Sequence, residues 1–120
     1  MGTYDLSERL LNFAVDVIYY SRTLENSIEN RIIKHQLIKA STSAGANYEE
    51  SQGAASNADF INKVKISLKE MREANYWLKV IKKTNVTGYK NVELEKLLDE
   101  SDQLKKILGA IIQKKSAKIQ

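Results

Sequence analysis

A regularly spaced row of basic residues, with one tyrosine in it, runs through the stretch 57–83. Its members are Lys65, Lys69, Arg72, Tyr76, Lys79 and Lys83. The steps between them alternate between four and three residues, which places all six on one face of an α-helix. Such cations can neutralise backbone phosphates, and the tyrosine can stack on an unpaired base. This row, called the basic stripe below, is a candidate surface for binding RNA or DNA.

The alternative for the basic stripe is a solvated face that keeps the protein in solution, which is the usual role of a run of surface charge. Like charges four residues apart on a helix repel each other by about 0.2–0.5 kcal/mol, and only Glu73 is placed to relieve Lys69. The net charge of +4, from 19 Lys and Arg against 15 Asp and Glu, permits an anionic partner without requiring one. Both interpretations stay open.

The same stretch carries more apolar surface than one helix of a bundle needs. The face expected to enter the core consists of Phe60, Val64, Ser67, Met71, Ala74 and Leu78. Beside it lie four further apolar residues, Ile66, Trp77, Val80 and Ile81. Such a wide apolar arc predicts a second partner, and we expect these four to form an interface between copies of the chain. The alternative is that Trp77 covers the end of the bundle within one copy.

Few residues could carry catalysis or bind a metal. His35 is the only histidine and cysteine is absent, which excludes a two-histidine metal site within one chain, a disulfide and a thiol nucleophile. Glu49, Glu50, Glu70 and Glu73 bring carboxylates to neighbouring helices, where they fit surface ion pairs equally well. No nucleophile or glycine-rich phosphate loop accompanies them. We therefore expect no enzymatic activity, no metal and no cofactor.

Long helices must position these residues. The sequence contains no proline and only five glycines, which favours uninterrupted helices. Apolar residues recur at steps of three and four in four segments, and the expected helices are about 5–22, 27–51, 57–83 and 91–115.

The ends of these helices carry capping residues. Asp5, Asn26 and Ser56 are the expected N-terminal caps of the first three helices. Asn85 or Gly88 could cap the C-terminal end of the third.

The connections between the helices are short, so consecutive helices should pack as antiparallel neighbours. The predicted fold is an all-α, antiparallel up-and-down four-helix bundle, formed by residues 1–120 as a single domain. Small side chains at Ala40, Ala44 and Gly45 should mark the closest approach between helices. No apolar run reaches the length of a membrane span and no signal peptide is recognised, so we expect a cytoplasmic protein without a membrane partner.

Several ordered motifs resemble the bacterial four-helix bundle proteins encoded in intervening sequences of 23S ribosomal RNA genes. The first is Ala46-Asn47-Tyr48 with Glu50 two residues later. It is followed by Asp59–Lys63, by Ser67–Glu70 and by Glu73–Leu78, the last of which contains Tyr76-Trp77-Leu78. The resemblance extends to ERLLNFAVDVI near the start and ESDQLKKILGAIIQKK near the end, and so covers most of the chain.

The resemblance implies a non-enzymatic bundle that assembles into a ring-shaped homopentamer. The related accessory variability protein of diversity-generating retroelements is a basic pentameric barrel that binds nucleic acid and a reverse transcriptase. Both likenesses favour self-association and nucleic-acid binding, although a shared fold alone does not transfer a function. The function expected is therefore a homo-oligomeric module that binds RNA or DNA through the basic stripe. The alternative is a scaffold that binds another protein and no nucleic acid.

Overall fold

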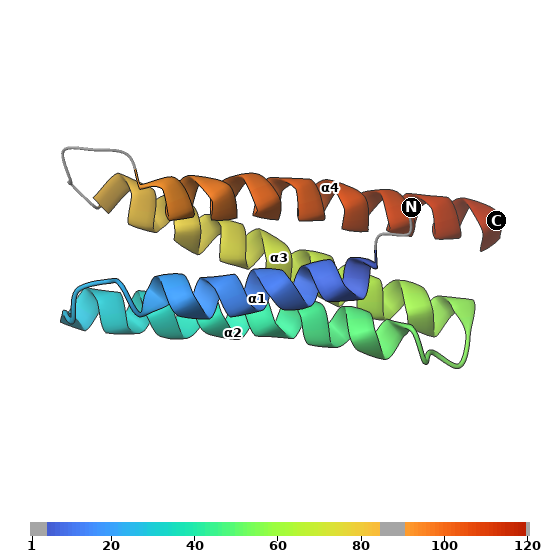
Figure 1. Ribbon diagram of the computed structural model, residues 1–120. Helices are drawn as coiled ribbons and strands as arrows, with labels where there is room; N and C mark the ends of the chain where they lie inside the picture. The colour runs from blue at the N-terminus through green and yellow to red at the C-terminus, as the bar shows by residue number, and fades with distance from the viewer. Residues whose placement is uncertain (1–4, 85–90, 120) are drawn as a thin grey trace.

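The computed structural model describes residues 5–84 and 91–119, and within them the side chains as far as residue 117. This part of the chain forms four helices: α1 (Leu6–Ser21), α2 (Ile28–Ser51), α3 (Asn57–Thr84) and α4 (Val92–Ile119) (Figure 1). Helix α1 contacts α2 and α4, and α3 contacts the same two helices from the opposite corner. The predicted all-α, up-and-down four-helix bundle is therefore confirmed.

The fourth helix is longer than expected from the sequence. It continues to Ile119, four residues past the expected end near 115. The ammonium of Lys115 lies 5.0 Å from the centre of the Phe60 ring, which ties this part of α4 to the first turn of α3. Asn85 and Gly88, the candidate C-terminal caps of the third helix, lie outside the described residues.

Side-chain caps fix where the helices begin. Asp5 and Ser56 accept the backbone N–H of the residue three positions later, at 3.4 and 3.0 Å, as expected. Helix α2 is capped by Ser27, whose backbone is extended, and not by Asn26. Ser27 Oγ accepts the N–H of Asn30 at 3.1 Å, because this serine directly precedes the first helical residue.

Leucine and other apolar side chains from all four helices fill the centre of the bundle. The fully buried members include Leu10, Phe13 and Val17 from α1, Leu37 and Ala44 from α2, Val64, Met71 and Leu78 from α3, and Leu104 and Leu108 from α4. Each large aliphatic side chain buried in this way stabilises the fold by roughly 1.5–3 kcal/mol relative to an exposed one.

Small side chains let the helices approach each other closely where the sequence predicted. Ala44 is fully buried, and its backbone carbonyl accepts a hydrogen bond from Ser67 Oγ on α3 at 2.7 Å. Gly45, the next residue, faces Leu10 on α1. A methyl group built at Gly45 would lie 3.6 Å from Leu10 Cβ, which is ordinary van der Waals contact, so the crossing does not require glycine.

Helix α1 is the shortest of the four, with 16 residues against 28 in α4. The C-terminal turns of α4 extend past the first residue of α1 (Figure 1). Arg9 fixes α1 to α4 by a two-point contact with Glu100, in which Nε and Nη2 lie 2.7 and 2.8 Å from the two carboxylate oxygens. None of the described helices is long and apolar enough to cross a lipid bilayer.

Candidate functional site

The structure places all six residues of the basic stripe on the exposed side of α3, away from the core. Tyr76 lies in the middle of the row and is 58% exposed. Among the described residues, no carboxylate lies within salt-bridge distance of the five cations of the stripe. The stripe therefore keeps five positive charges uncompensated over about 27 Å of helix, at 1.5 Å per residue.

Two neighbouring side chains determine how Tyr76 is presented. Its ring lies 5.2 Å from that of Trp77, at an interplanar angle of 77°, which is an edge-to-face contact. Trp77 is itself partly buried against the core, and its indole N–H donates to Glu73 Oε2 at 3.3 Å. Glu73 is thus held by Trp77 and forms no ion pair with Lys69. Trp77 thus supports the Tyr76 ring from one side, and more than half of the Tyr76 side chain is exposed to solvent.

The four residues expected to form an interface do not form one continuous surface patch. Ile66 is 39% exposed, whereas Trp77 and Val80 are partly buried against the core of their own bundle. Ile81 is only 2% exposed and belongs to the core. The core-facing side of α3 extends to Ile81 because α3 packs against both α2 and α4. Of the four residues, Ile66 is therefore the one most available to a partner.

The larger exposed apolar surface lies on α1 and on the first turns of α2. Leu11 is 61% exposed and Ile28 is 69% exposed, and Val15, Tyr19 and Ile32 are exposed as well. This surface was not predicted from the sequence. The signal was present, because Ile28 and Ile32 fall one turn apart and on a different face from the buried Ile33 and Leu37.

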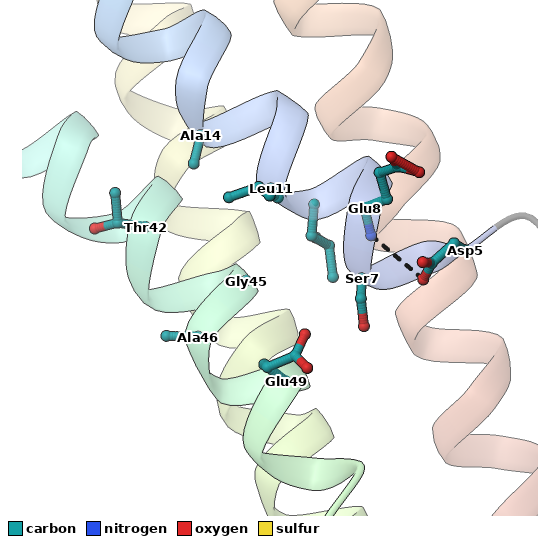
Figure 2. A pocket seen from close by; sticks show the side chains of 10 residues that line it. Asp5, Ser7, Glu8, Leu11, Ala14, Thr42, Gly45, Ala46 and Glu49 are labelled. Atoms are coloured by element: carbon teal, nitrogen blue, oxygen red, sulfur yellow. Dashed lines mark hydrogen bonds between the residues drawn. The ribbon is translucent and has the colours of Figure 1, made fainter.

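Next to this surface, a groove of about 650 Å³ runs between α1 and α2. It is lined by Asp5, Ser7, Glu8, Leu10, Leu11, Ala14, Thr42, Gly45, Ala46 and Glu49. Figure 2 shows Leu11 and Ala14 on the α1 side, with Glu49 on α2 turned toward the first turn of α1. Three of the described lining residues are carboxylates and none of them is basic, so an apolar part of the groove adjoins an acidic end.

A buried polar cluster joins α3 to α4, and it too was missed. Asn75 is 2% exposed, and its Nδ2 donates to Ser101 Oγ at 2.7 Å and to Asp102 Oδ1 at 3.2 Å. Its Oδ1 accepts from Lys105 Nζ at 3.1 Å, and Lys105 also pairs with Asp102 at 3.3 Å. The amide is therefore fully hydrogen-bonded inside the bundle, which gives the cluster a structural role.

The remaining carboxylates and the histidine are not brought together. Glu50 pairs with Lys63 at 3.0 Å, and this contact raises the pKa of the Lys63 ammonium. Glu49 and His35 are exposed on α2. Within residues 5–84 and 91–119, no group of three or more His, Asp and Glu side chains is arranged to hold a metal ion.

Burial raises the pKa of two tyrosines, both outside the basic stripe. At Tyr20 desolvation is the main cause, and the negative charge of Glu93 adds to it. At Tyr48 desolvation again dominates, and the charge of Asp5 adds to it. Both effects disfavour the phenolate.

Both the sequence and the fold of this chain are similar to those of known proteins. A protein of unknown function from the S23 ribosomal protein family of Bacteroides thetaiotaomicron has a similar crystal structure, with a TM-score of 0.78 and 34% sequence identity. The alignment covers 88% of this chain and 96% of that one. No curated protein matches the chain. The model of the 23S rRNA-intervening sequence protein family matches residues 3–110, and the chain therefore belongs to that family.

Proposed function

We propose that this chain is a non-catalytic, homo-oligomeric four-helix bundle that binds RNA or DNA through backbone phosphates lying along the basic stripe. The observation that carries the proposal is the row of five exposed cations on α3 without a carboxylate partner among the described residues. Phosphates would relieve the repulsion within this row and release bound counterions, which makes binding favourable and sensitive to salt.

Tyr76 gives the stripe a means of holding unpaired bases. Its ring is exposed and is braced by Trp77, so little side-chain freedom is lost when a base stacks on it. Stacking accepts any base, and phosphate contacts carry no sequence information. We therefore expect single-stranded nucleic acid to bind with little sequence preference.

Assembly would repeat the stripe and so raise its affinity for a long polyanion. The exposed apolar residues of α1 and α2 support self-association, because several exposed apolar side chains on two neighbouring helices favour a contact that covers them. Five copies is the number implied by the family resemblance, and the proposed place of action is the cytoplasm, in keeping with a cysteine-free sequence.

The test of nucleic-acid binding measures the fluorescence anisotropy of a labelled RNA of mixed sequence between about 50 and 200 mM salt. In the test variant Lys69, Arg72 and Lys79 are all replaced by Glu. In the matched control Lys96, Lys106 and Lys114, which are exposed on α4, are replaced by Glu with the same change in net charge. We expect the test variant to lose most of its affinity and the control to keep it. Equal affinity in the two variants, or no binding by the unchanged protein at low salt, would refute the proposal.

The test of assembly is size-exclusion chromatography with light scattering on the unchanged protein. We expect a mass several times that of one chain. A monomer at high protein concentration would refute the homo-oligomer.

The competing function is a protein–protein scaffold without nucleic-acid binding. It is favoured by the exposed apolar surface of α1 and α2, which a protein partner could cover as well as a second copy. Partners cross-linked to the protein in cells would then survive nuclease treatment and depend on Leu11 and Ile32. They would not depend on Lys69 and Arg72.

A further inference from the structure

The groove between α1 and α2 combines an apolar lining with negative charge, a chemistry that a basic helix with an exposed apolar residue would complement. Its walls come from Asp5–Ala14 on α1 and from Thr42–Glu49 on α2, which span about 13 and 10 Å at 1.5 Å per residue. Leu11, Ala14 and Ala46 supply the apolar part of the lining, and small side chains there leave room for a partner (Figure 2). Asp5 and Glu49 bring negative charge to one end, and Glu8, whose carboxylate turns away from Glu49, adds negative charge beside it (Figure 2).

The first half of the basic stripe has the complementary properties. Lys65, Lys69 and Arg72 are exposed and span about 10 Å of α3, the same length as the α2 wall of the groove. Ile66 lies next to Lys65 and is the exposed apolar residue of this half. This half of the stripe thus presents three cations and one exposed isoleucine. The groove presents three carboxylates and the exposed Leu11.

These two surfaces cannot meet within one copy. Helices α1 and α3 occupy opposite corners of the bundle and do not contact each other, and the stripe faces away from the core. We propose that the groove between α1 and α2 receives the first half of α3 from a second copy of this chain. The inference rests on the homo-oligomer proposed above and names the two surfaces that form it.

A contact between two different surfaces has a defined consequence for assembly. Each copy uses its groove toward one neighbour and its stripe toward the other, so the contact repeats head to tail and closes into a ring when the rotation allows. The second half of the stripe, with Tyr76, Lys79 and Lys83, extends beyond the 10 Å that the groove can cover. In the assembled protein this second half is the part of the stripe left to bind phosphates, whereas an unassembled chain offers all five cations. The RNA affinity lost by the variant with Lys69, Arg72 and Lys79 replaced therefore combines the loss of Lys79 with the loss of assembly. Replacing Lys79 and Lys83 alone separates the two.

Exchanging the charges of the two surfaces tests the contact directly. One variant carries Glu8→Lys with Glu49→Lys in the groove, and another carries Lys69→Glu with Arg72→Glu in the stripe. We expect each to weaken self-association by at least about tenfold in sedimentation equilibrium, because like charges then face each other. A third variant with all four changes restores attraction and should assemble nearly as well as the unchanged chain. Mixing the first two variants should restore self-association in assemblies where the two variants alternate, because each groove then meets a stripe of opposite charge.

Several results would overturn the contact. Self-association unaffected by the groove variant, or not restored by the fourfold variant, would show that a second copy does not occupy the groove. If the unchanged protein is oligomeric and the rescue fails, this inference alone is refuted. If the rescue succeeds and RNA does not bind, nucleic-acid binding is refuted and the contact stands.

A second variant avoids any effect of charge reversal on folding. Leu11→Ser removes an apolar side chain that is already exposed, so the monomer should keep its stability while self-association weakens. Val92→Ser, at a similarly exposed valine on α4, is the matched control and should assemble normally. Equal assembly by the two variants would contradict the proposed contact.

Discussion

Asn75 on α3 and Ser101 on α4 are joined by a hydrogen bond of 2.7 Å, Nδ2 to Oγ, in the interior of the bundle. Ser101 Oγ in turn donates a hydrogen bond to the backbone carbonyl of Leu98 at 3.0 Å. A helix pair held only by apolar contacts could slide or rotate at small cost. A buried amide whose hydrogen bonds are all made in one arrangement penalises other registers, because shifting α4 would leave the amide unpaired. The cluster therefore fixes how α3 and α4 face each other.

Replacement of Asn75 by Ala should lower the free energy of unfolding by about 1–3 kcal/mol. The change removes the amide, leaves Asp102 and Lys105 with one partner fewer, and opens a small cavity. Urea unfolding followed by circular dichroism measures the loss. Asn62→Ala, at an exposed position of the same helix, is the control and should change stability by less than about 0.5 kcal/mol. Equal values for the two variants would show that the cluster does not stabilise the fold.

Stability should fall as the pH rises above about 10, partly through Tyr20. Burial raises the pKa of this phenol, so the folded protein retains the proton at a pH where the unfolded chain has lost it. The contribution of Tyr20 to the free energy of unfolding is complete below the pKa that this phenol has in the unfolded chain. It is lost as the pH rises through the higher pKa of the folded protein. Tyr20→Phe should weaken this alkaline loss relative to Tyr19→Phe, an exposed neighbour, in urea titrations at several pH values. The same dependence of the free energy of unfolding on pH in both variants would show that Tyr20 does not cause the alkaline loss.

At neutral pH the same Tyr20→Phe variant should be as stable as the unchanged protein or more so, by up to about 1 kcal/mol. Tyr20 Oη is buried, and no described residue forms a hydrogen bond with it. Removing the hydroxyl therefore leaves no partner unpaired. A clear loss of stability at pH 7 would show that the hydroxyl is bonded in solution.

Two glycines should be replaceable by alanine with a gain in stability of roughly 0.5–1 kcal/mol each. At Gly109, inside α4, a methyl group would meet nothing within 4 Å, and at Gly45 it would touch Leu10 at an ordinary distance. The gain comes from restricting the unfolded chain and from better helix propensity. Thermal unfolding should shift upward for both variants. A decrease confined to Gly45→Ala would show that α1 and α2 pack more closely in solution.

The two halves of the basic stripe should separate in function. Lys79→Glu with Lys83→Glu should weaken RNA binding and flatten its dependence on salt, because two phosphate contacts are lost. Self-association should stay unchanged, since these residues lie beyond the half of α3 that enters the groove. Anisotropy and sedimentation on the same sample measure both properties. A fall in assembly as large as that caused by Lys69→Glu with Arg72→Glu would show that the stripe acts as one surface.

Periodicity was enough to predict the bundle, because α1, α3 and α4 each carry an apolar row at steps of three and four. It also placed the basic stripe on an exposed side of α3, since six residues spaced so evenly share one face wherever the core lies. It failed at Ile81, assigned to a surface and found in the core, because the edge of an apolar arc depends on how far the neighbouring helices extend around it.

Features made by two helices together could not be predicted from either one. The groove depends on how α1 lies against α2, and its acidic end combines Asp5 and Glu8 from α1 with Glu49 from α2. Asn75 is a polar residue in a helix rich in polar residues, and its burial follows only from the position of Ser101. These contacts are set by tertiary packing, which local sequence patterns do not encode.

The short length of α1 has a consequence for local opening. We expect α1, with 16 residues, to open locally before the other helices, because its loss leaves the contacts of α3 with α2 and α4 in place. Backbone amides of α1 should then exchange hydrogen with solvent faster than those of α3, which packs between α2 and α4. If a neighbouring copy occupies the groove, it bridges α1 and α2, and the exchange of α1 amides slows as protein concentration rises. Assembly would then stabilise the shortest helix of each copy against local opening.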